Sequence, residues 1–100
     1  MSRIVYFDNA ATSYPKPEEV YRAVDHYQRE VGATPGRSGH RMALAAGRVV
    51  LDARQRLARL FNVADSARVI LTSNCTEALN LAVKGLVRPG DHVVIVEHLA

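Results

Sequence analysis

The sequence TSNCTEALN, residues 72–80, decides the fold of this chain because it joins one apolar stretch, VIL, to a second one, LAV. Small polar residues in this position are typical of the point where a buried strand turns into a helix. Asn74 suits the N-cap position, and Glu77 follows at the spacing of a capping box. The first N–H groups of a helix have no partner within it and carry the positive end of its dipole. The junction therefore predicts an anion site at Cys75 and Thr76.

Two stretches before this junction have the periodicity of helices. Apolar residues four, three and four positions apart follow Pro17 and predict a helix over about residues 17–30, which Gly32 ends. A second apolar stripe predicts a long helix over residues 41–61, with its arginines mostly outward. The stripes consist of Val20, Val24, Tyr27 and Val31, and of Met42, Ala46, Val49, Ala53, Leu57 and Leu60.

The junction itself lies within a predicted strand, helix and strand. Residues 68–72 and 92–96 have the composition of strands, residues 75–87 that of a helix, and residues 88–91 that of a turn. The four consecutive apolar residues 93–96 indicate a strand that is covered on both faces. The predicted fold class is therefore α/β, with helices that lead into a parallel βαβ unit.

The composition is that of a soluble globular protein. Of the 100 residues, 48% are hydrophobic and 23% are charged, with a formal net charge of +3. No apolar stretch is long enough to span a membrane, so we expect a cytoplasmic protein without a membrane partner. Basic residues alternate with acidic and apolar ones, which does not favour nucleic-acid binding. The single cysteine, Cys75, cannot form an internal disulfide.

Four motifs, in this order, resemble the N-terminal part of a known enzyme family. They are YFDNAATSYPKP at residues 6–17, PGRSGHR at 35–41, the junction at 72–80, and Glu97-His98. The resemblance is to class V aminotransferase-fold enzymes of the cysteine desulfurase and selenocysteine lyase group. These are pyridoxal 5′-phosphate (PLP) enzymes of fold type I. The resemblance covers essentially the whole chain, which corresponds to only the first portion of such an enzyme.

The resemblance assigns cofactor roles to residues near the junction. It implies that Cys75 and Thr76 bind the PLP phosphate and that His98 stacks on the cofactor ring as a catalytic residue. Asn80 belongs to the same signature, although a local bond to the backbone is an equal alternative for its side chain. Asn74 stands where the family usually has glycine; asparagine is the next residue most tolerant of positive φ. No metal site is expected.

The resemblance also implies a substrate-proximal set in the first two motifs. Asn9, Ala10 and Ala11 would line the substrate pocket, since small residues permit close approach of the backbone. Arg37 would bind a carboxylate or form a structural ion pair, and His40 would be close to substrate or act as an acid or base. The alternative is an extended N-terminal segment and a helix-initiating turn with solvated side chains.

The chain lacks residues that a complete enzyme of this kind needs. Its two lysines are Lys16, between prolines, and Lys84, eight residues beyond Thr76. At about 1.5 Å per residue, Lys84 would lie roughly 12 Å down the helix from the phosphate. We therefore expect an N-terminal fragment that is inactive alone. Residues 1–40 would form an N-terminal segment, helix and active-site loop, and residues 41–100 a long helix and the start of an incomplete PLP-binding domain.

The reaction that the resemblance implies is cysteine desulfuration: L-cysteine gives L-alanine, and the sulfur passes to an enzyme cysteine. The resemblance also implies that the intact enzyme is a homodimer, which binds a small amino-acid substrate and delivers sulfur to an acceptor protein. Cys75 is not favoured as the nucleophile, because in the family that cysteine lies downstream on a separate loop. Selenocysteine lyase, a kynureninase-like hydrolase, a true aminotransferase, and a small α/β module that binds a phosphorylated ligand stay open as alternatives.

Overall fold

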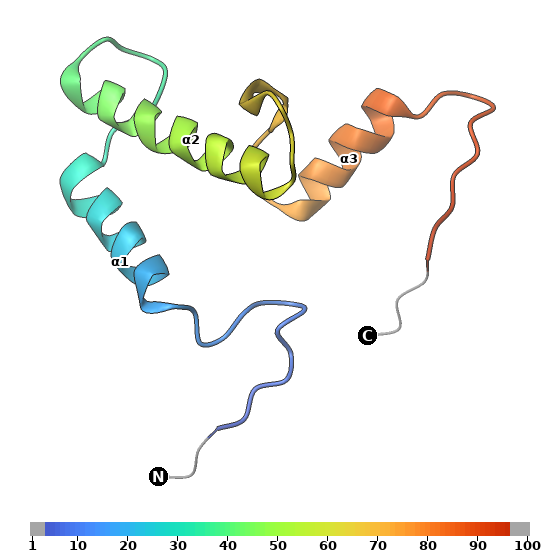
Figure 1. Cartoon of the computed structure of the whole chain (residues 1–100), viewed down its shortest axis with the longest axis horizontal. Coiled ribbons are helices and arrows are strands. Elements are labelled where there is room, and N and C mark those ends of the chain that lie inside the picture. Colours follow the sequence, from blue (N-terminus) through green and yellow to red (C-terminus); the bar gives the residue numbers. More distant parts are fainter. Residues whose placement is uncertain (1–3, 97–100) are drawn as a thin grey trace. The chain divides into compact units, whose positions relative to one another are not determined.

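The computed structural model describes residues 4–96, and its regular elements are helices (Figure 1). In chain order they are α1 (Glu18–His26), η1 (Tyr27–Val31), α2 (Arg41–Leu60), η2 (Ser66–Arg68) and α3 (Cys75–Leu86). The helices predicted over 17–30, 41–61 and 75–87 are therefore confirmed. Each observed end lies within one residue of the predicted one, when α1 and η1 are taken together. No helix in this part of the chain is long and apolar enough to cross a membrane.

The first helix changes its winding before it ends. α1 continues directly into η1, a π-helical turn, and Gly32 then adopts the left-handed conformation with φ of 49°. The Gly32 N–H donates to the Tyr27 carbonyl at 2.7 Å. The Tyr27 hydroxyl also donates to the Ala33 carbonyl at 2.9 Å and so fixes the start of the following loop. Gly32 ends the helix as predicted, because a residue with a Cβ is strained at positive φ.

The long helix α2 ends in a Schellman motif. Asn62 has a positive φ of 54°, the conformation that asparagine tolerates best after glycine. Its N–H donates to the Arg59 carbonyl at 3.3 Å, and the Val63 N–H donates to the Ala58 carbonyl at 2.7 Å. These two bonds satisfy carbonyls that the helix leaves without partners and turn the chain back at residue 62.

The chain divides into two units within α2. The first comprises Met1–Ala53 and the second Arg54–Ala100. Within residues 4–96 the buried residues are three alanines of α2: Ala43 and Ala46 in the first unit, and Ala58 in the second. Neither unit has a large fully buried side chain among the described residues. The domain boundary predicted at residue 40 stays a prediction.

The two predicted strands are not formed in residues 4–96, so the predicted βαβ unit is not shown in this part of the chain. Arg68 ends the 3₁₀ turn η2, which Asp65 caps by accepting from the Ala67 N–H at 2.9 Å. Val69 is extended, with φ of −89° and ψ of 112°, but extended backbone becomes a strand only when a neighbour supplies ladder hydrogen bonds. The described residues supply none. Residues 91–96 are likewise irregular.

The second of these segments is also not covered as predicted. Ile95 and Val96 are 87% and 89% exposed, whereas a central strand would be buried on both faces. The turn before it does form. The Asp91 N–H donates to the Arg88 carbonyl at 3.1 Å, and the Asp91 carboxylate accepts from the Arg88 N–H at 2.7 Å.

Candidate functional site

The N-terminus of α3 is closed by a pair of reciprocal hydrogen bonds. The Asn74 side chain accepts from the Glu77 N–H at 2.8 Å, and the Glu77 carboxylate accepts from the Ser73 N–H at 2.9 Å. The capping box predicted from the spacing is confirmed, except that Glu77 reaches one residue before the cap rather than the cap itself. Thr72 supports the turn, since its hydroxyl donates to the Asn74 carbonyl at 2.9 Å.

This arrangement leaves two adjacent backbone donors without an acceptor. The Ala78 N–H donates to the Asn74 carbonyl at 3.2 Å, and the Glu77 N–H is bonded to the Asn74 side chain. The N–H groups of Cys75 and Thr76 form no hydrogen bond with any described residue. Both residues are exposed, and the Cys75 thiol is free. Two open N–H groups at the positive end of a 12-residue helix suit a phosphate.

Asn80 takes the local alternative. Its side-chain amide donates to the Thr76 carbonyl at 2.9 Å, one helical turn back. The bond occupies the amide group on the helix itself and holds it beside the first turn.

The first motif forms an ordered turn around Asn9. The N–H groups of Ala11 and Thr12 both donate to the Asp8 carbonyl, at 3.2 and 3.4 Å. The Asn9 side chain accepts from the Tyr14 N–H at 3.0 Å and donates to the Tyr6 carbonyl at 3.4 Å. Ala10 and Ala11 lie at the exposed tip of this turn. Residues 8–14 therefore form a turn rather than the extended segment that the alternative interpretation described.

The second motif begins α2. The Nδ1 atom of His40 accepts from the Ala43 N–H at 3.2 Å, and the His40 carbonyl accepts from the Leu44 N–H at 3.1 Å. His40 thus acts as the N-cap of α2. Because Nδ1 accepts a hydrogen bond, the neutral ring has its proton on Nε2, and Nε2 is the nitrogen open to a ligand.

Arg37 lines a cavity of about 560 Å³ beside the start of α2. A second arginine, Arg48, lines the same cavity, and residues 31–51 contain no acidic residue. The other lining residues are Gly36, Ser38, Ala43, Leu44, Gly47 and Leu51. A cavity that two arginines line together with small and apolar residues suits an anionic ligand with an apolar part.

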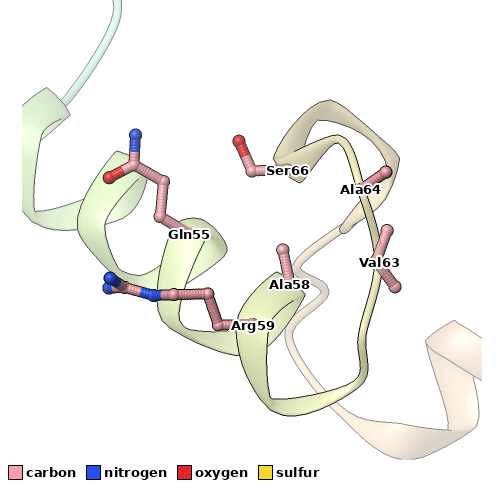
Figure 2. A pocket seen from close by; sticks show the side chains of 6 residues that line it. All are labelled: Gln55, Ala58, Arg59, Val63, Ala64 and Ser66. Atoms are coloured by element: carbon pink, nitrogen blue, oxygen red, sulfur yellow. The ribbon is translucent and has the colours of Figure 1, made fainter.

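Another cavity, of about 330 Å³, contains none of the predicted site residues. Figure 2 shows its lining side chains, which come from the last turns of α2 and from the segment that follows the Schellman motif. They are Gln55, Ala58, Arg59, Val63, Ala64 and Ser66. It has no nucleophile with an adjacent base, and we assign it no catalytic role.

The predicted site residues are distributed over both units. Cys75 and Thr76 lie together in the second unit. The candidates Asn9, Ala10, Ala11, Arg37 and His40 all belong to the first. His98, and Glu97 before it, lie outside the described residues.

Almost the whole chain matches the sequence profile of one enzyme family. Residues 5–100 match the profile of the family described as aminotransferase class-V. The chain belongs to this family.

Several curated relatives of this class V chain are cysteine desulfurases by name. A probable cysteine desulfurase of Methanothermobacter thermautotrophicus is 39% identical over 97 residues, which is 94% of this chain and 24% of that protein. A probable cysteine desulfurase of Treponema pallidum is 30% identical over 97 residues, 93% of this chain and 24% of that protein. The cysteine desulfurase of Synechococcus elongatus is 32% identical over 103 residues, 97% of this chain and 16% of that protein.

The class V chain thus resembles a cysteine desulfurase along its length, and it spans a quarter or less of the relatives named here. No solved structure is significantly similar to it.

The sequence did not predict two side-chain roles in these motifs: the hydrogen bonds of the Tyr6 hydroxyl and the capping of α2 by His40. The Tyr6 hydroxyl donates to the carbonyls of Asp8 and Thr12, at 3.0 and 2.9 Å. His40 was considered as an acid or base, not as the side-chain cap of α2. Histidine is not among the favoured N-cap residues, and a tyrosine three residues before Asn9 has no periodic signal. Only the position of His40, directly before the predicted start of the long helix, could have indicated the cap.

Proposed function

We propose that this chain contributes the phosphate-binding and substrate-binding elements of a PLP-dependent cysteine desulfurase. The reaction would convert L-cysteine to L-alanine and transfer the sulfur to an enzyme cysteine outside this chain. The observation that carries the proposal is the pair of open N–H groups at Cys75 and Thr76, in a chain that belongs to the class V family. The names of its relatives support the choice of cysteine as substrate.

The N-terminus of α3 fits the phosphate of PLP. The N–H groups of Cys75 and Thr76 and the Thr76 hydroxyl supply three donors, while the Asn74 side chain keeps the Glu77 N–H occupied. The helix dipole adds about 0.3–1 kcal/mol for an anion at this end. When bound, PLP supplies an electron sink for cleavage of bonds at the substrate.

The first unit would bind the amino-acid substrate. The guanidinium of Arg37 can hold the substrate carboxylate through two parallel hydrogen bonds. The Nε2 atom of His40 is free to exchange a proton with a bound group, because Nδ1 is held by the Ala43 N–H. The tip of the turn at Ala10 and Ala11 offers backbone rather than side chains to the ligand. His98 is proposed to stack on the cofactor ring.

Neither lysine of the chain suits the covalent attachment of PLP. The Lys16 ammonium donates to the Ser13 carbonyl at 2.9 Å, within a segment between two prolines. Lys84 lies in the last turn of α3, roughly 12 Å from Thr76 along the helix axis at about 1.5 Å per residue. We infer that the attachment lysine lies outside this chain and that the chain alone has no turnover.

We further propose a cytoplasmic homodimer that passes sulfur to an acceptor protein. The formal charge of +3 and the interleaved charges support a solvated surface rather than one for nucleic acid or a membrane. The exposed apolar side chains of α3 and residues 93–96 supply surface that other parts of such an enzyme would cover.

The test compares two proteins: the 100-residue chain and the product of its reading frame extended beyond codon 100. One sample of each is incubated with PLP, reduced with borohydride and mapped by mass spectrometry. A second, unreduced sample is assayed for sulfide release from L-cysteine with an added dithiol, which reduces the enzyme persulfide to thiol and sulfide. We expect a single labelled lysine beyond residue 100 and turnover only in the extended protein. Stoichiometric labelling of Lys84 with turnover, or an extended protein that releases no sulfide, would contradict the proposal.

A further inference from the structure

One hydroxyl group bridges the two ends of the N-terminal turn of the first unit. The Tyr6 Oη lies 3.0 Å from the Asp8 carbonyl oxygen and 2.9 Å from that of Thr12. These carbonyls flank the turn that contains Asn9, Ala10 and Ala11. A hydroxyl has one proton, so the two carbonyls share it in a three-centre bond. Tyr6 therefore fixes the distance between the two ends of the turn.

Burial and packing set Tyr6 apart from its neighbours. Among residues 4–26 it alone is half-buried, and all others are exposed. Its ring packs edge to face on the Tyr14 ring, with centroids 5.6 Å apart and an interplanar angle of 75°. Aromatic pairs favour this geometry because the positive edge of one ring meets the negative face of the other. The ring contact keeps the hydroxyl aimed at the turn.

The Asn9 amide closes the same turn from inside. Its oxygen accepts from the Tyr14 N–H at 3.0 Å, and its nitrogen donates to the Tyr6 carbonyl at 3.4 Å. Both ends of the amide are thus bonded to backbone of the two residues whose rings pack together. Asn9 thus orders the turn through one accepted and one donated hydrogen bond.

We propose that Tyr6 and Asn9 are positioning residues, which hold the backbone of Ala10 and Ala11 in the conformation that meets the substrate. The identity of that substrate rests on the proposed function. The contacts that carry the inference lie within the first 14 residues and need no other part of the chain. The substrate then meets the backbone of the turn, while the side chains of Tyr6 and Asn9 act only through it.

Two matched substitutions test this inference. Tyr6→Phe removes the hydroxyl and keeps the ring contact, and Tyr14→Phe removes a hydroxyl from the other ring of the pair. Amide exchange is measured by NMR on the labelled 100-residue chain. We expect the N–H groups of Ala11, Thr12 and Tyr14 to exchange about threefold to tenfold faster in Tyr6→Phe, the range of one ordinary hydrogen bond, and to be unchanged in Tyr14→Phe.

A second readout separates positioning from mere folding. In the extended protein, Tyr6→Phe should raise KM for cysteine about threefold to tenfold with kcat within about twofold, because uniform substrate binding is lost. Asn9→Ala should behave in the same way, and Asn9→Asp, which keeps the acceptor for the Tyr14 N–H, should restore most of the loss. The PLP absorbance should be unchanged in all three.

The results that would contradict the positioning role of Tyr6 and Asn9 differ from those that would contradict the proposed desulfurase function. Equal exchange rates in Tyr6→Phe and Tyr14→Phe would show that the hydroxyl does not hold the turn. Faster exchange with an unchanged KM would show that the turn does not serve the substrate. If the unsubstituted extended protein released no sulfide, the proposed function would fail, and the exchange rates alone would decide whether Tyr6 holds the turn.

Discussion

At the N-terminus of α3, two adjacent N–H groups differ from the two that follow. Those of Glu77 and Ala78 are bonded to Asn74, whereas those of Cys75 and Thr76 have no acceptor among the described residues. The difference follows from one side chain, because Asn74 can satisfy the third N–H of the helix but not the first two. A phosphate bound here would complete a set that the sequence leaves half satisfied.

We expect Asn74 to have separable effects on the helix and on the ligand. Asn74→Ala removes the cap acceptor and should lower the stability of α3 by about 1 kcal/mol, seen as a lower midpoint in thermal circular dichroism. Asn74→Asp keeps the acceptor, so helix content should be retained. Its negative charge beside a bound phosphate should weaken PLP binding, and more so at low salt. An unchanged midpoint in Asn74→Ala would contradict the role of the cap.

The three main helices could be predicted from the sequence because their signals are local. Periodicity marks α1 and α2, Gly32 ends the first helix, and the spacing of Asn74 and Glu77 starts α3. The candidate phosphate donors followed from the same local pattern. Strands at 68–72 and 92–96 are different, since a strand needs ladder hydrogen bonds from a neighbour, and residues 4–96 supply none. The Tyr6 contacts join a side chain to carbonyls up to six residues away, which no periodic pattern encodes.

For α2, the prediction concerns the double use of His40. His40→Ala should lower stability by about 1 kcal/mol through loss of the cap, whereas His40→Asn, a favoured cap residue, should restore it. In the extended protein, both variants should lose about a hundredfold in sulfide release if Nε2 exchanges a proton with substrate. Stability is followed by circular dichroism and turnover by sulfide assay. Full activity in His40→Asn would leave His40 with the cap as its only role.

At the scale of the molecule, many large apolar side chains stay exposed, and the buried residues in the described range 4–96 are three alanines. Val94, Ile95 and Val96 are 78%, 87% and 89% exposed, although each buried side chain of this kind would contribute about 1.5–3 kcal/mol. The chain spans 24% of its relative from Methanothermobacter thermautotrophicus. We infer that sequence corresponding to the rest of such a relative covers this surface, and that the uncovered segment promotes self-association.

Val94→Lys tests this inference in two proteins. In the 100-residue chain it should reduce self-association in sedimentation equilibrium, because a charge opposes burial of this exposed apolar segment against another copy. In the extended protein the same lysine would be buried, so the thermal midpoint should fall markedly. Leu60→Lys is the control: it adds the same charge at a residue that is 74% exposed and outside the segment. Equal self-association in the two variants would contradict a specific role for residues 92–96.

The most direct measurement of the central claim is the PLP affinity of Cys75→Pro compared with Cys75→Ala. Proline fits the first position of a helix and removes only the N–H there, and Asn74 before it already has the extended conformation that proline requires. Alanine keeps the N–H and removes the thiol. Helix content should be unchanged in both. We predict that Cys75→Ala binds PLP within about twofold of the unsubstituted protein, while Cys75→Pro binds at least about tenfold more weakly, the loss of one charge-assisted hydrogen bond. Equal affinities in the two variants would contradict the assignment of the phosphate to the N-terminus of α3.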